Sequence, residues 1–489
     1  MQQLLNPFAQ KYPENTDTAL PTQATSVRFN RYGPYAGHYL ACGCGDGTVE
    51  VWDMETKGVI KTLEGHVKPV GGVAWSRNNR YLLTSSLDST AIIWDLSFLP
   101  NPLLQPYTPY TSGKTASITS SNSSQRVRTI RFDAPVAQAV FHPRNSKIVL
   151  ASLTCNEVVL VDLRSGGGRW KLSDVMEGGG EGEMEVDGAE VKGKKSALTC
   201  AAWSPCGSRI YAGTTGGLLL VIDPLSRYVM NRIRVANSGI KQLTFDAMGR
   251  NIILSSTDRA LRTLSVDSRT GALAPVHRFQ DLINRTPWHA IAFSGDAEYV
   301  MGGAGHKMAH NVFIWDRDSG SLVKVLEGPR EPLVDCDWHP TRPVIASVST
   351  LGEIHLWQTS SPDNWAAFAP GFEELEENVE YDEREDEFDI EDESDLLRRK
   401  DAEEDVVIDV LSPSDDYPRR PENIPTSRSP SRAVKTEQME DEGEEEREAI
   451  RLAQAVKEWA DNDPDDDTWE GFHMSLDLLT ETEITVLSS

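Results

Sequence analysis

The side chains with the greatest potential for chemistry are a histidine and its polar neighbours, His66, Ser86 and Asp88. A histidine in such company could serve in acid–base catalysis. Gly65 and Trp94 belong to the same stretch, however, and buried polar side chains of this kind commonly satisfy one another and an indole N–H. We therefore predict a structural role for His66.

No other part of the sequence carries the pattern of an enzyme. The glycine runs at 166–168 and 178–180 have neither a strand before them nor a helix after them to aim backbone N–H groups at a phosphate. A GxSxG nucleophile turn and an HExxH zinc helix are both absent from the sequence. We expect a protein with no catalytic residue, no cofactor and no small-molecule substrate.

The six cysteines indicate reduced thiols, because none stands in a CxxC pair. Cys42 and Cys44 can share one face of a strand, but no second His or Cys pair follows at ligand spacing, so no metal site is expected. The sequence has no run of about 18 apolar residues and no apolar leader after Met1. These features predict a soluble intracellular protein without membrane contact.

A repeated Trp-Asp ending organises the first three quarters of the chain. Full endings occur at Trp52-Asp53, Trp94-Asp95 and Trp315-Asp316. The degraded endings are Val161-Asp162, Ile222-Asp223, Val266-Asp267 and Trp357-Gln358. Each ending follows an aromatic marker of an inner strand, namely Phe29, Trp75, Phe141 in the motif Phe141-His142-Pro143, Trp203, Phe245, Phe293 and Trp338. A period of roughly 40 residues with this ending is typical of WD repeats, so we predict an all-β, seven-bladed WD-repeat β-propeller.

The propeller is expected to span residues 23–362, after an N-terminal segment at 1–22. Two long spacings predict insertions at about 101–125 and 165–195, both interpreted as mobile loops on the rim. Either the N-terminal segment or the residues just after Trp357 should supply the last outer strand and close the ring, because closure removes exposed strand edges.

The blades are not equally complete. Blade 2 has the whole hydrogen-bonding set of His66, Ser86, Asp88 and Trp94. Blades 6 and 7 lack it, with Ala309 and Leu351 in the place of the aspartate, and are expected to depend on packing.

Acidic residues are concentrated at the end of the chain. From Gly371 to Ser489 there are 41 Asp or Glu against 12 Lys or Arg, whereas the whole chain has 75 against 48. Such segments repel themselves and lack apolar content. We predict a largely disordered acidic C-terminal tail, made of a partner-binding segment at 363–411 and an acidic disordered segment at 412–489. Within the latter, Glu444 to Trp459 could form an amphipathic helix.

The partner-binding segment has apolar anchors embedded in acids. The anchors are Trp365, Phe368, Phe372 and Tyr381, then Phe388 and Ile390, and finally the run from Val406 to Val410. Segments of this kind can fold on binding, with buried aromatic residues giving affinity and carboxylates giving orientation. Three docking motifs in series are therefore expected.

Four motifs together give a more specific resemblance. They are Asn284-Arg285-Thr286-Pro287-Trp288, Trp338-His339-Pro340, Asn364-Trp365 through Pro370, and Glu377 through Glu393. With them the chain, from about Leu4 to Val410, resembles the retinoblastoma-binding protein 5 family in a fungal-type form. That family is the WD-repeat subunit of COMPASS-type histone H3 lysine 4 methyltransferase complexes. The resemblance implies a nuclear chromatin regulator that acts as a scaffold and activating subunit and is no enzyme itself.

The resemblance also implies three binding segments in the tail. The segment that would activate the SET domain of the catalytic subunit comprises Ala367, Phe368, Ala369, Pro370, Phe372 and Leu375. The segment that would bind a SPRY-domain subunit comprises Glu380, Tyr381, Glu383, Glu385, Glu387, Phe388, Asp389, Ile390 and Glu391. The segment for a second WD-repeat subunit comprises Asp405, Val406, Val407, Ile408, Asp409 and Val410, where Ile408 and the extra valine depart from the family's more acidic pattern.

For the propeller, the resemblance implies docking on the nucleosome through its DNA backbone and histones. The candidate phosphate contacts are Arg234, Arg269, Arg285 and Lys307, each expected on a loop between strands. The alternative is a WD-repeat histone-binding chaperone or ubiquitin-ligase adaptor, in which the acidic tail binds basic surfaces by bulk charge alone.

Overall fold

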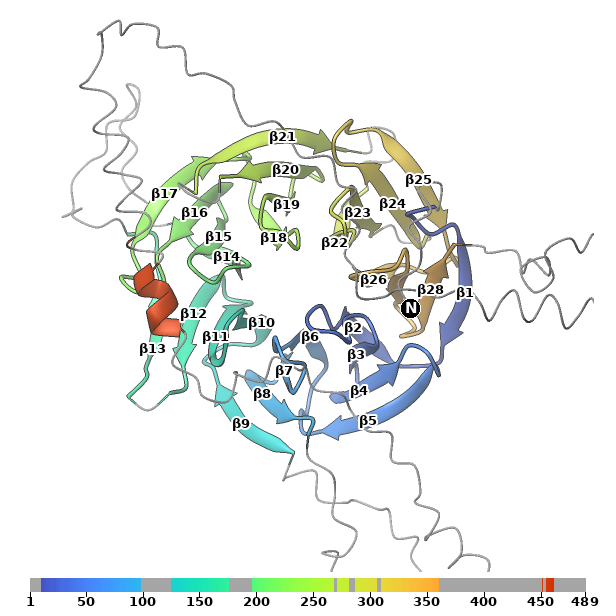
Figure 1. Ribbon diagram of the computed structural model, residues 1–489, viewed down its shortest axis with the longest axis horizontal. Coiled ribbons are helices and arrows are strands. Elements are labelled where there is room, and N and C mark those ends of the chain that lie inside the picture. The colour runs from blue at the N-terminus through green and yellow to red at the C-terminus, as the bar shows by residue number, and fades with distance from the viewer. Residues whose placement is uncertain are drawn as a thin grey trace, which may run out of the picture. The chain divides into compact units, whose positions relative to one another are not determined.

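The computed structural model describes residues 10–97, 125–164, 166–175, 196–267, 271–280, 286–305, 309–359, 451 and 454–460. Within these ranges the chain forms seven four-stranded antiparallel sheets, arranged as blades around a ring (Figure 1). The predicted seven-bladed β-propeller is confirmed.

Each blade runs from an inner first strand to an outer fourth strand. Blade 1 comprises β2 (Ala24–Phe29), β3 (Tyr39–Cys44), β4 (Thr48–Asp53) and β5 (Gly58–Glu64); blade 2 comprises β6 (Val70–Trp75), β7 (Tyr81–Ser86), β8 (Thr90–Asp95) and β9 (Arg126–Arg131). Blade 3 comprises β10 (Val136–His142), β11 (Asn145–Leu153), β12 (Glu157–Asp162) and β13 (Arg169–Leu172); blade 4 comprises β14 (Leu198–Trp203), β15 (Ile210–Thr214), β16 (Leu218–Ile222) and β17 (Val229–Arg234). Blade 5 comprises β18 (Ile240–Phe245), β19 (Asn251–Ser256), β20 (Leu261–Val266) and β21 (Leu273–Phe279); blade 6 comprises β22 (Trp288–Phe293), β23 (Tyr299–Ala304), β24 (Asn311–Asp316) and β25 (Leu322–Glu327). Blade 7 comprises β26 (Leu333–Trp338), β27 (Ile345–Ser349), β28 (Ile354–Gln358) and β1 (Asn15–Leu20).

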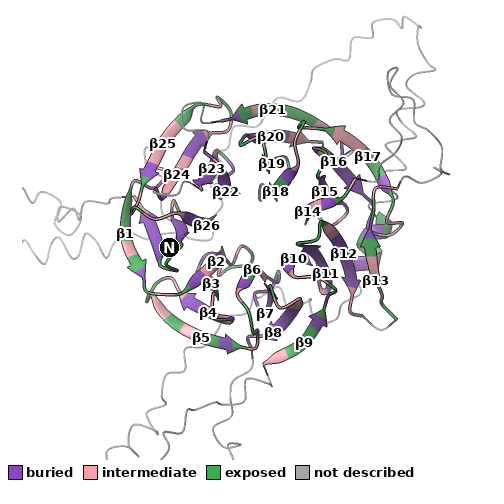
Figure 2. Cartoon of the chain, turned by 180° about the vertical axis from the view of Figure 1, so that it is seen from behind, coloured by how far each residue is buried: buried purple, intermediate pink, exposed green. Residues whose placement is uncertain are grey.

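The repeat seen in the sequence corresponds to these strands. The Trp-Asp endings lie at the ends of third strands, as at the end of β8, and the aromatic markers lie at the ends of first strands, as Trp75 does in β6. Inner strands such as β3 are buried throughout, because neighbouring blades cover both of their faces. Figure 2 shows the outermost strands as a mixture of exposed and partly exposed residues around this buried interior.

The N-terminal segment closes the ring. β1 pairs with β28 in antiparallel register from Asn15 opposite Gln358 to Leu20 opposite Ile354. Leu20 joins a core cluster shared by blades 1 and 7, with only 4% of its surface exposed. The pairing decides between the two closing segments considered from the sequence, and it moves the start of the propeller from residue 23 to Asn15.

The second insertion is shorter than the sequence suggested. Residues 165–195 were expected to form a loop, but Arg169–Leu172 within them form β13, the outer strand of blade 3. A turn with Gly166 at φ +80° leads into this strand, and Leu172 is buried in the core between blades 3 and 4. Residues 176–195 and 98–124 lie outside the described residues.

The ring has two faces that carry different connections. Because strands within a blade are antiparallel, the turns from first to second strand and from third to fourth strand share one face, which we call the lower face. The turns from second to third strand share the upper face with the connections between blades. Hydrogen bonds link turns of one face to each other, as between Met54 N–H and His38 O below and between Thr257 N–H and Gly239 O above.

The polar set of blade 2 exists, but with a different hydroxyl. His66 Nε2 lies 2.8 Å from Thr84 Oγ1, which also accepts the Trp94 indole N–H at 3.0 Å. On its other side, His66 Nδ1 lies 3.0 Å from the Asp88 carboxylate. Ser86, the hydroxyl expected from the sequence, bonds instead to the carbonyls of Lys68 and Pro69. His66 is 8% exposed, in agreement with the structural role predicted for it.

Blade 7 has a polar set that the sequence did not suggest. His310 reaches across from the upper turn of blade 6, and its Nε2 lies 2.7 Å from Ser347 Oγ. Ser347 also accepts the Trp357 indole N–H at 2.8 Å. The expectation that blade 7 depends on packing alone was wrong, because the histidine comes from a neighbouring blade. Blade 6 does rely on packing, with Trp315 among Trp288, Phe279 and Phe313.

Two histidines fasten one blade to the next. His142 Nε2 bonds to Gly207 O at 3.0 Å, and His339 Nε2 bonds to Gly37 O at 3.1 Å. In each case Nδ1 accepts a backbone N–H two residues on, from Arg144 in the first pair, so Nε2 carries the ring proton. These are the His-Pro motifs of the sequence, and their rings are neutral.

One described segment of the tail is helical and lies on the propeller. Residues 454–460 form a short helix beside β12 and β13 (Figure 1). Val456 and Ala460 are buried, and Trp459 packs against the core cluster of blades 3 and 4. The predicted helix is therefore found at these residues, within a segment expected to lack order, because the propeller supplies the apolar partner that the tail itself does not have.

Replacing Thr84 by valine should destabilise the protein, since it removes the partner of both the His66 ring and the Trp94 indole. We expect the free energy of unfolding to fall by about 2 kcal/mol or more, the usual result of leaving buried polar groups unsatisfied. Urea denaturation measures it. Thr62→Val is the control, because Thr62 is exposed on β5 and should change stability little. Equal effects of the two substitutions would contradict the assignment.

Acid should begin to weaken the propeller near pH 6.5, above the pH at which carboxylates titrate. Burial lowers the pKa of His310, beside His355, and of His339, beside Arg342, to about 4 from 6.5. Since the folded state resists protonation that the unfolded chain accepts, the free energy of unfolding should fall as pH drops from about 6.5 toward about 4. Urea denaturation at pH 7.5 and pH 5 tests it. The double variant His310→Gln, His339→Gln should show a smaller difference between the two pH values, and an unchanged difference would contradict this origin.

Candidate interaction surfaces

The tail leaves the propeller from a fixed point on the lower face. β28 ends there at Gln358, whose carbonyl accepts the Glu14 N–H at 3.0 Å and whose side-chain amide donates to Asp17 at 3.3 Å. The pairing with β1 therefore fixes the position of the chain as far as Gln358, a residue or two before the tail begins. All the tail residues predicted to bind the SET domain, the SPRY domain or a second WD-repeat subunit, at 367–375, 380–391 and 405–410, lie outside the described residues.

Of the four predicted phosphate contacts, the structure describes Arg234. It is the last residue of β17, rather than a loop residue as expected, and its side chain is exposed at the upper face of blade 4. Arg269, Arg285 and Lys307 lie outside the described residues.

The strands before and after Arg269, Arg285 and Lys307 are described, and their ends show on which face of the ring each gap begins and ends. Residues 281–285 connect β21 to β22, and residues 306–308 connect β23 to β24, so both gaps are bounded by strand ends at the upper face. Residues 268–270 connect β20 to β21, whose bounding ends lie at the lower face. Arg234 and the strand ends that bound the gaps of Arg285 and Lys307 therefore lie on the upper face. The strand ends that bound the gap of Arg269 lie on the lower face.

More positive charge lies near the inner rim of the same upper face. Lys241 is exposed at the start of β18, and His289 is exposed at the start of β22. Gln242 donates to the His289 carbonyl at 2.6 Å, which ties the two strands together. Partial burial and the Lys241 charge lower the pKa of His289, so the histidine is neutral at pH 7 and the lysine provides the charge.

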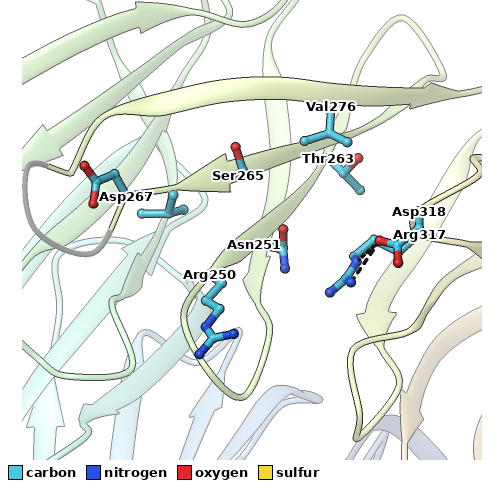
Figure 3. Close-up of a pocket in the computed structure, with 9 residues that line it drawn as sticks. Arg250, Asn251, Thr263, Ser265, Asp267, Val276, Arg317 and Asp318 are labelled. Atoms are coloured by element: carbon cyan, nitrogen blue, oxygen red, sulfur yellow. Dashed lines mark hydrogen bonds and ion pairs between the residues drawn. The ribbon is translucent and has the colours of Figure 1, made fainter. Parts of the chain in front are cut away.

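The lower face of blades 5 and 6 has a shallow hollow of about 450 Å³. Its lining includes Arg250, Asn251, Asp267, Arg317 and Asp318 (Figure 3). Arg317 is bound to its neighbour Asp318 at 2.9 Å, so part of the charge in the hollow is already neutralised. A mixed, open surface of this kind fits contact with another protein better than the enclosure of a small molecule.

Metal-binding side chains do not cluster within the described part of the chain. Among the described residues, no group of three or more His, Cys, Asp or Glu side chains could hold a metal ion. The six cysteines are free; burial raises the pKa of the Cys42 and Cys336 thiols, which keeps them protonated. The described part of the chain also has no helix long and apolar enough to cross a membrane.

One surface was missed by sequence reasoning. His142, Asn145 and Arg164, on the lower face of blade 3, contact the helix at 454–460. The helical pattern around Trp459 was visible in the sequence, and so was the His-Pro motif at His142. What the sequence could not show is that these two signals, more than 300 residues apart, meet in space.

The repeats and the fold both have known counterparts. The family described as "WD domain, G-beta repeat" matches residues 20–53, 57–95 and 320–358. A crystal structure of the β-propeller domain of Cps50 (Swd1) from Myceliophteria thermophila superposes with a TM-score of 0.58 and 32% sequence identity, covering 71% of this chain and 99% of that one.

Similar proteins extend beyond the propeller. The "Set1 complex component swd1" of Schizosaccharomyces pombe is 34% identical over 88% of this chain and 99% of its own. The "Retinoblastoma-binding protein 5 homolog" of Drosophila melanogaster is 33% identical over 83% of this chain and 76% of its own. The "COMPASS component SWD1" of Saccharomyces cerevisiae is 30% identical over 83% of this chain and 91% of its own. The chain therefore belongs to the family of Swd1 and retinoblastoma-binding protein 5, as the motifs in its sequence indicated.

Proposed function

We propose that this protein is a non-catalytic scaffold and activating subunit of a nuclear histone H3 lysine 4 methyltransferase complex. Its tail holds the SET domain of the catalytic subunit against a SPRY-domain partner, and its propeller docks the assembly on the nucleosome. Two relatives named as components of the Set1 complex and of COMPASS support the assembly.

The proposal rests on one observation: the similarity to a relative extends beyond the propeller. The match to the Schizosaccharomyces pombe protein covers 88% of this chain, while residues 1–359 make up less than three quarters of it. The similarity therefore continues past β28 into the tail that holds the docking motifs. A match due only to WD repeats would end with the last blade.

The position of the tail suits a clamp. Ala367, the first residue of the proposed SET-activating segment, comes eight residues after Thr359, the last described residue of the propeller. Eight extended residues span at most about 28 Å, so a bound SET domain stays close to the lower face. Holding two domains in a productive arrangement raises the rate by removing unproductive conformers, without adding a catalytic group.

The nucleosome is proposed to bind at the upper face, because most of the candidate phosphate contacts lie there or next to strand ends there. Arg234 is exposed there, Lys241 adds charge near the inner rim, and the strand ends that bound residues 281–285 and 306–308 lie on the same face. Basic side chains on one face can meet one stretch of DNA backbone together, as phosphate contacts without sequence preference. A tail engaged at the lower face leaves this surface open.

Replacing Phe368 and Phe372 by alanine should reduce histone H3 methylation by a reconstituted complex of catalytic subunit, SPRY-domain subunit and full-length protein. Buried aromatic anchors carry most of the binding energy in such segments, so we expect a loss of tenfold or more. The variant Asp441→Asn, Glu442→Gln is the control, because it removes two acidic charges from the tail and leaves the anchors intact. Equal losses for both variants would favour the histone-binding chaperone or ubiquitin-ligase adaptor, in which bulk charge is decisive.

Arg234→Ala should weaken nucleosome binding and reduce its dependence on salt. Each lost phosphate contact lowers the slope of log affinity against log salt by about one. Binding of the full-length protein to nucleosomes at several salt concentrations measures both quantities. Arg269→Ala is the charge-matched control, because the strand ends that bound residues 268–270 lie at the opposite face. A larger effect of Arg269→Ala than of Arg234→Ala would contradict the assignment of the upper face.

A further inference from the structure

The helix at 454–460 meets the propeller with one side only. Val456 and Ala460, four residues apart, are 2% and 1% exposed, and Trp459 between them is half-buried. Lys457 and Glu458, on the other side, are exposed. This pattern is that of a helix docked through one apolar stripe.

The propeller also binds the last described residues of the helix through polar groups. Asn145 Nδ2 donates to the Ala460 carbonyl at 2.9 Å, and Arg164 donates to the Trp459 carbonyl. The last carbonyls of a helix have no partner within the helix and carry partial negative charge. An amide and a guanidinium are therefore suitable partners for the carbonyls of Trp459 and Ala460.

Arg164 contributes twice more. Its guanidinium lies 5.0 Å from the centre of the Trp459 ring, in a cation–π contact. It is held in that position by Asp162, which accepts from Arg164 Nη2 at 2.8 Å and from Nε at 3.0 Å. Arg164 therefore contacts both the ring and the backbone carbonyl of Trp459.

The other side chains of the surface are also held by contacts within blades 3 and 4. The His142 ring lies edge-on between Trp203, 4.6 Å away, and Trp459, 6.1 Å away. It is fixed by its bond to Gly207 O, and a side chain at residue 207 would collide with it, since a Cβ there would lie 2.5 Å from the ring. Asn145 is fully buried and anchored through Lys147 N–H at 2.8 Å. These constraints belong to blades 3 and 4 alone.

We propose that this surface, formed by His142, Asn145, Arg164 and Trp203, is a docking site for residues 454–460 of the same chain. The tail is then a closed loop, which leaves the propeller after β28 and is fastened again at blade 3. Both attachments lie on the lower face, because the contacts on blade 3 come from its first-to-second and third-to-fourth turns. The three proposed partner-binding segments lie between the two attachments.

Occupancy by the same chain is favoured over occupancy by another protein. A segment tethered to its site has a high effective concentration, which a free competitor must overcome. Short helices have little stability in water by themselves, so the helicity of residues 454–460 is expected to depend on the contact. Protection of its backbone amides is therefore a direct measure of docking.

Hydrogen–deuterium exchange on the full-length protein tests the contact. In Arg164→Ala, amide protection of residues 454–460 should fall tenfold or more, while β10 and β11 keep theirs, which shows that the blade still folds. Lys457→Ala is the matched control within the helix, because its side chain is exposed and alanine favours helix. Unchanged protection in Arg164→Ala, or equal loss in Lys457→Ala, would overturn the proposal.

A second measurement asks whether the site is occupied in the intact chain. A fluorescent peptide of residues 448–463 is titrated into the full-length protein and into its Val456→Pro variant, in which proline breaks the helix. The peptide should bind the variant at least tenfold more tightly, since only there is the surface free. Equal binding to both proteins, or to neither, would overturn the proposal. Neither readout involves methylation, so the proposed function and this proposal can fail separately.

Discussion

The pairing of β1 with β28 is the constraint on which the rest of the structure depends. Without it, blade 7 would have three strands and an exposed edge, and the ring would remain open. Buried charge reinforces the junction, because Asp335 of β26 accepts from Arg28 at 2.7 Å and from the Val27 backbone at 3.1 Å. The N-terminus and the end of the propeller thus stabilise each other, although they are separated by more than 300 residues.

Closure of the ring also determines on which face the tail begins. Because β28 must end beside β1 on the lower face, the tail starts there, and the helix at 454–460 returns to that face at blade 3. Arg234 and the anchors of two other basic candidates lie on the upper face. Under the proposed function, an enzyme bound near the start of the tail and a nucleosome bound at the upper face use different surfaces of the propeller.

The repeated strands of the blades could be predicted from the sequence, whereas contacts between residues far apart in the chain could not. Seven endings and seven aromatic markers were enough for the blades, since each is local to one strand. The hydroxyl of the blade 2 set was misassigned to Ser86, because Thr84 and Ser86 point to the same face of β7 and only their distances from His66 distinguish them. His310 could not be assigned to Ser347, because it crosses from another blade. The roles of Phe368, Tyr381 and Ile408 stay predictions from resemblance.

The central claim is that activation resides in the tail while the propeller is a platform. The most direct test is methylation of a free histone H3 peptide by the catalytic and SPRY-domain subunits, with either residues 360–411 or residues 1–359 added. We predict that residues 360–411 restore most of the stimulation given by the full-length protein, and that residues 1–359 restore none. Stimulation by the propeller alone, with none from the tail segment, would contradict the account.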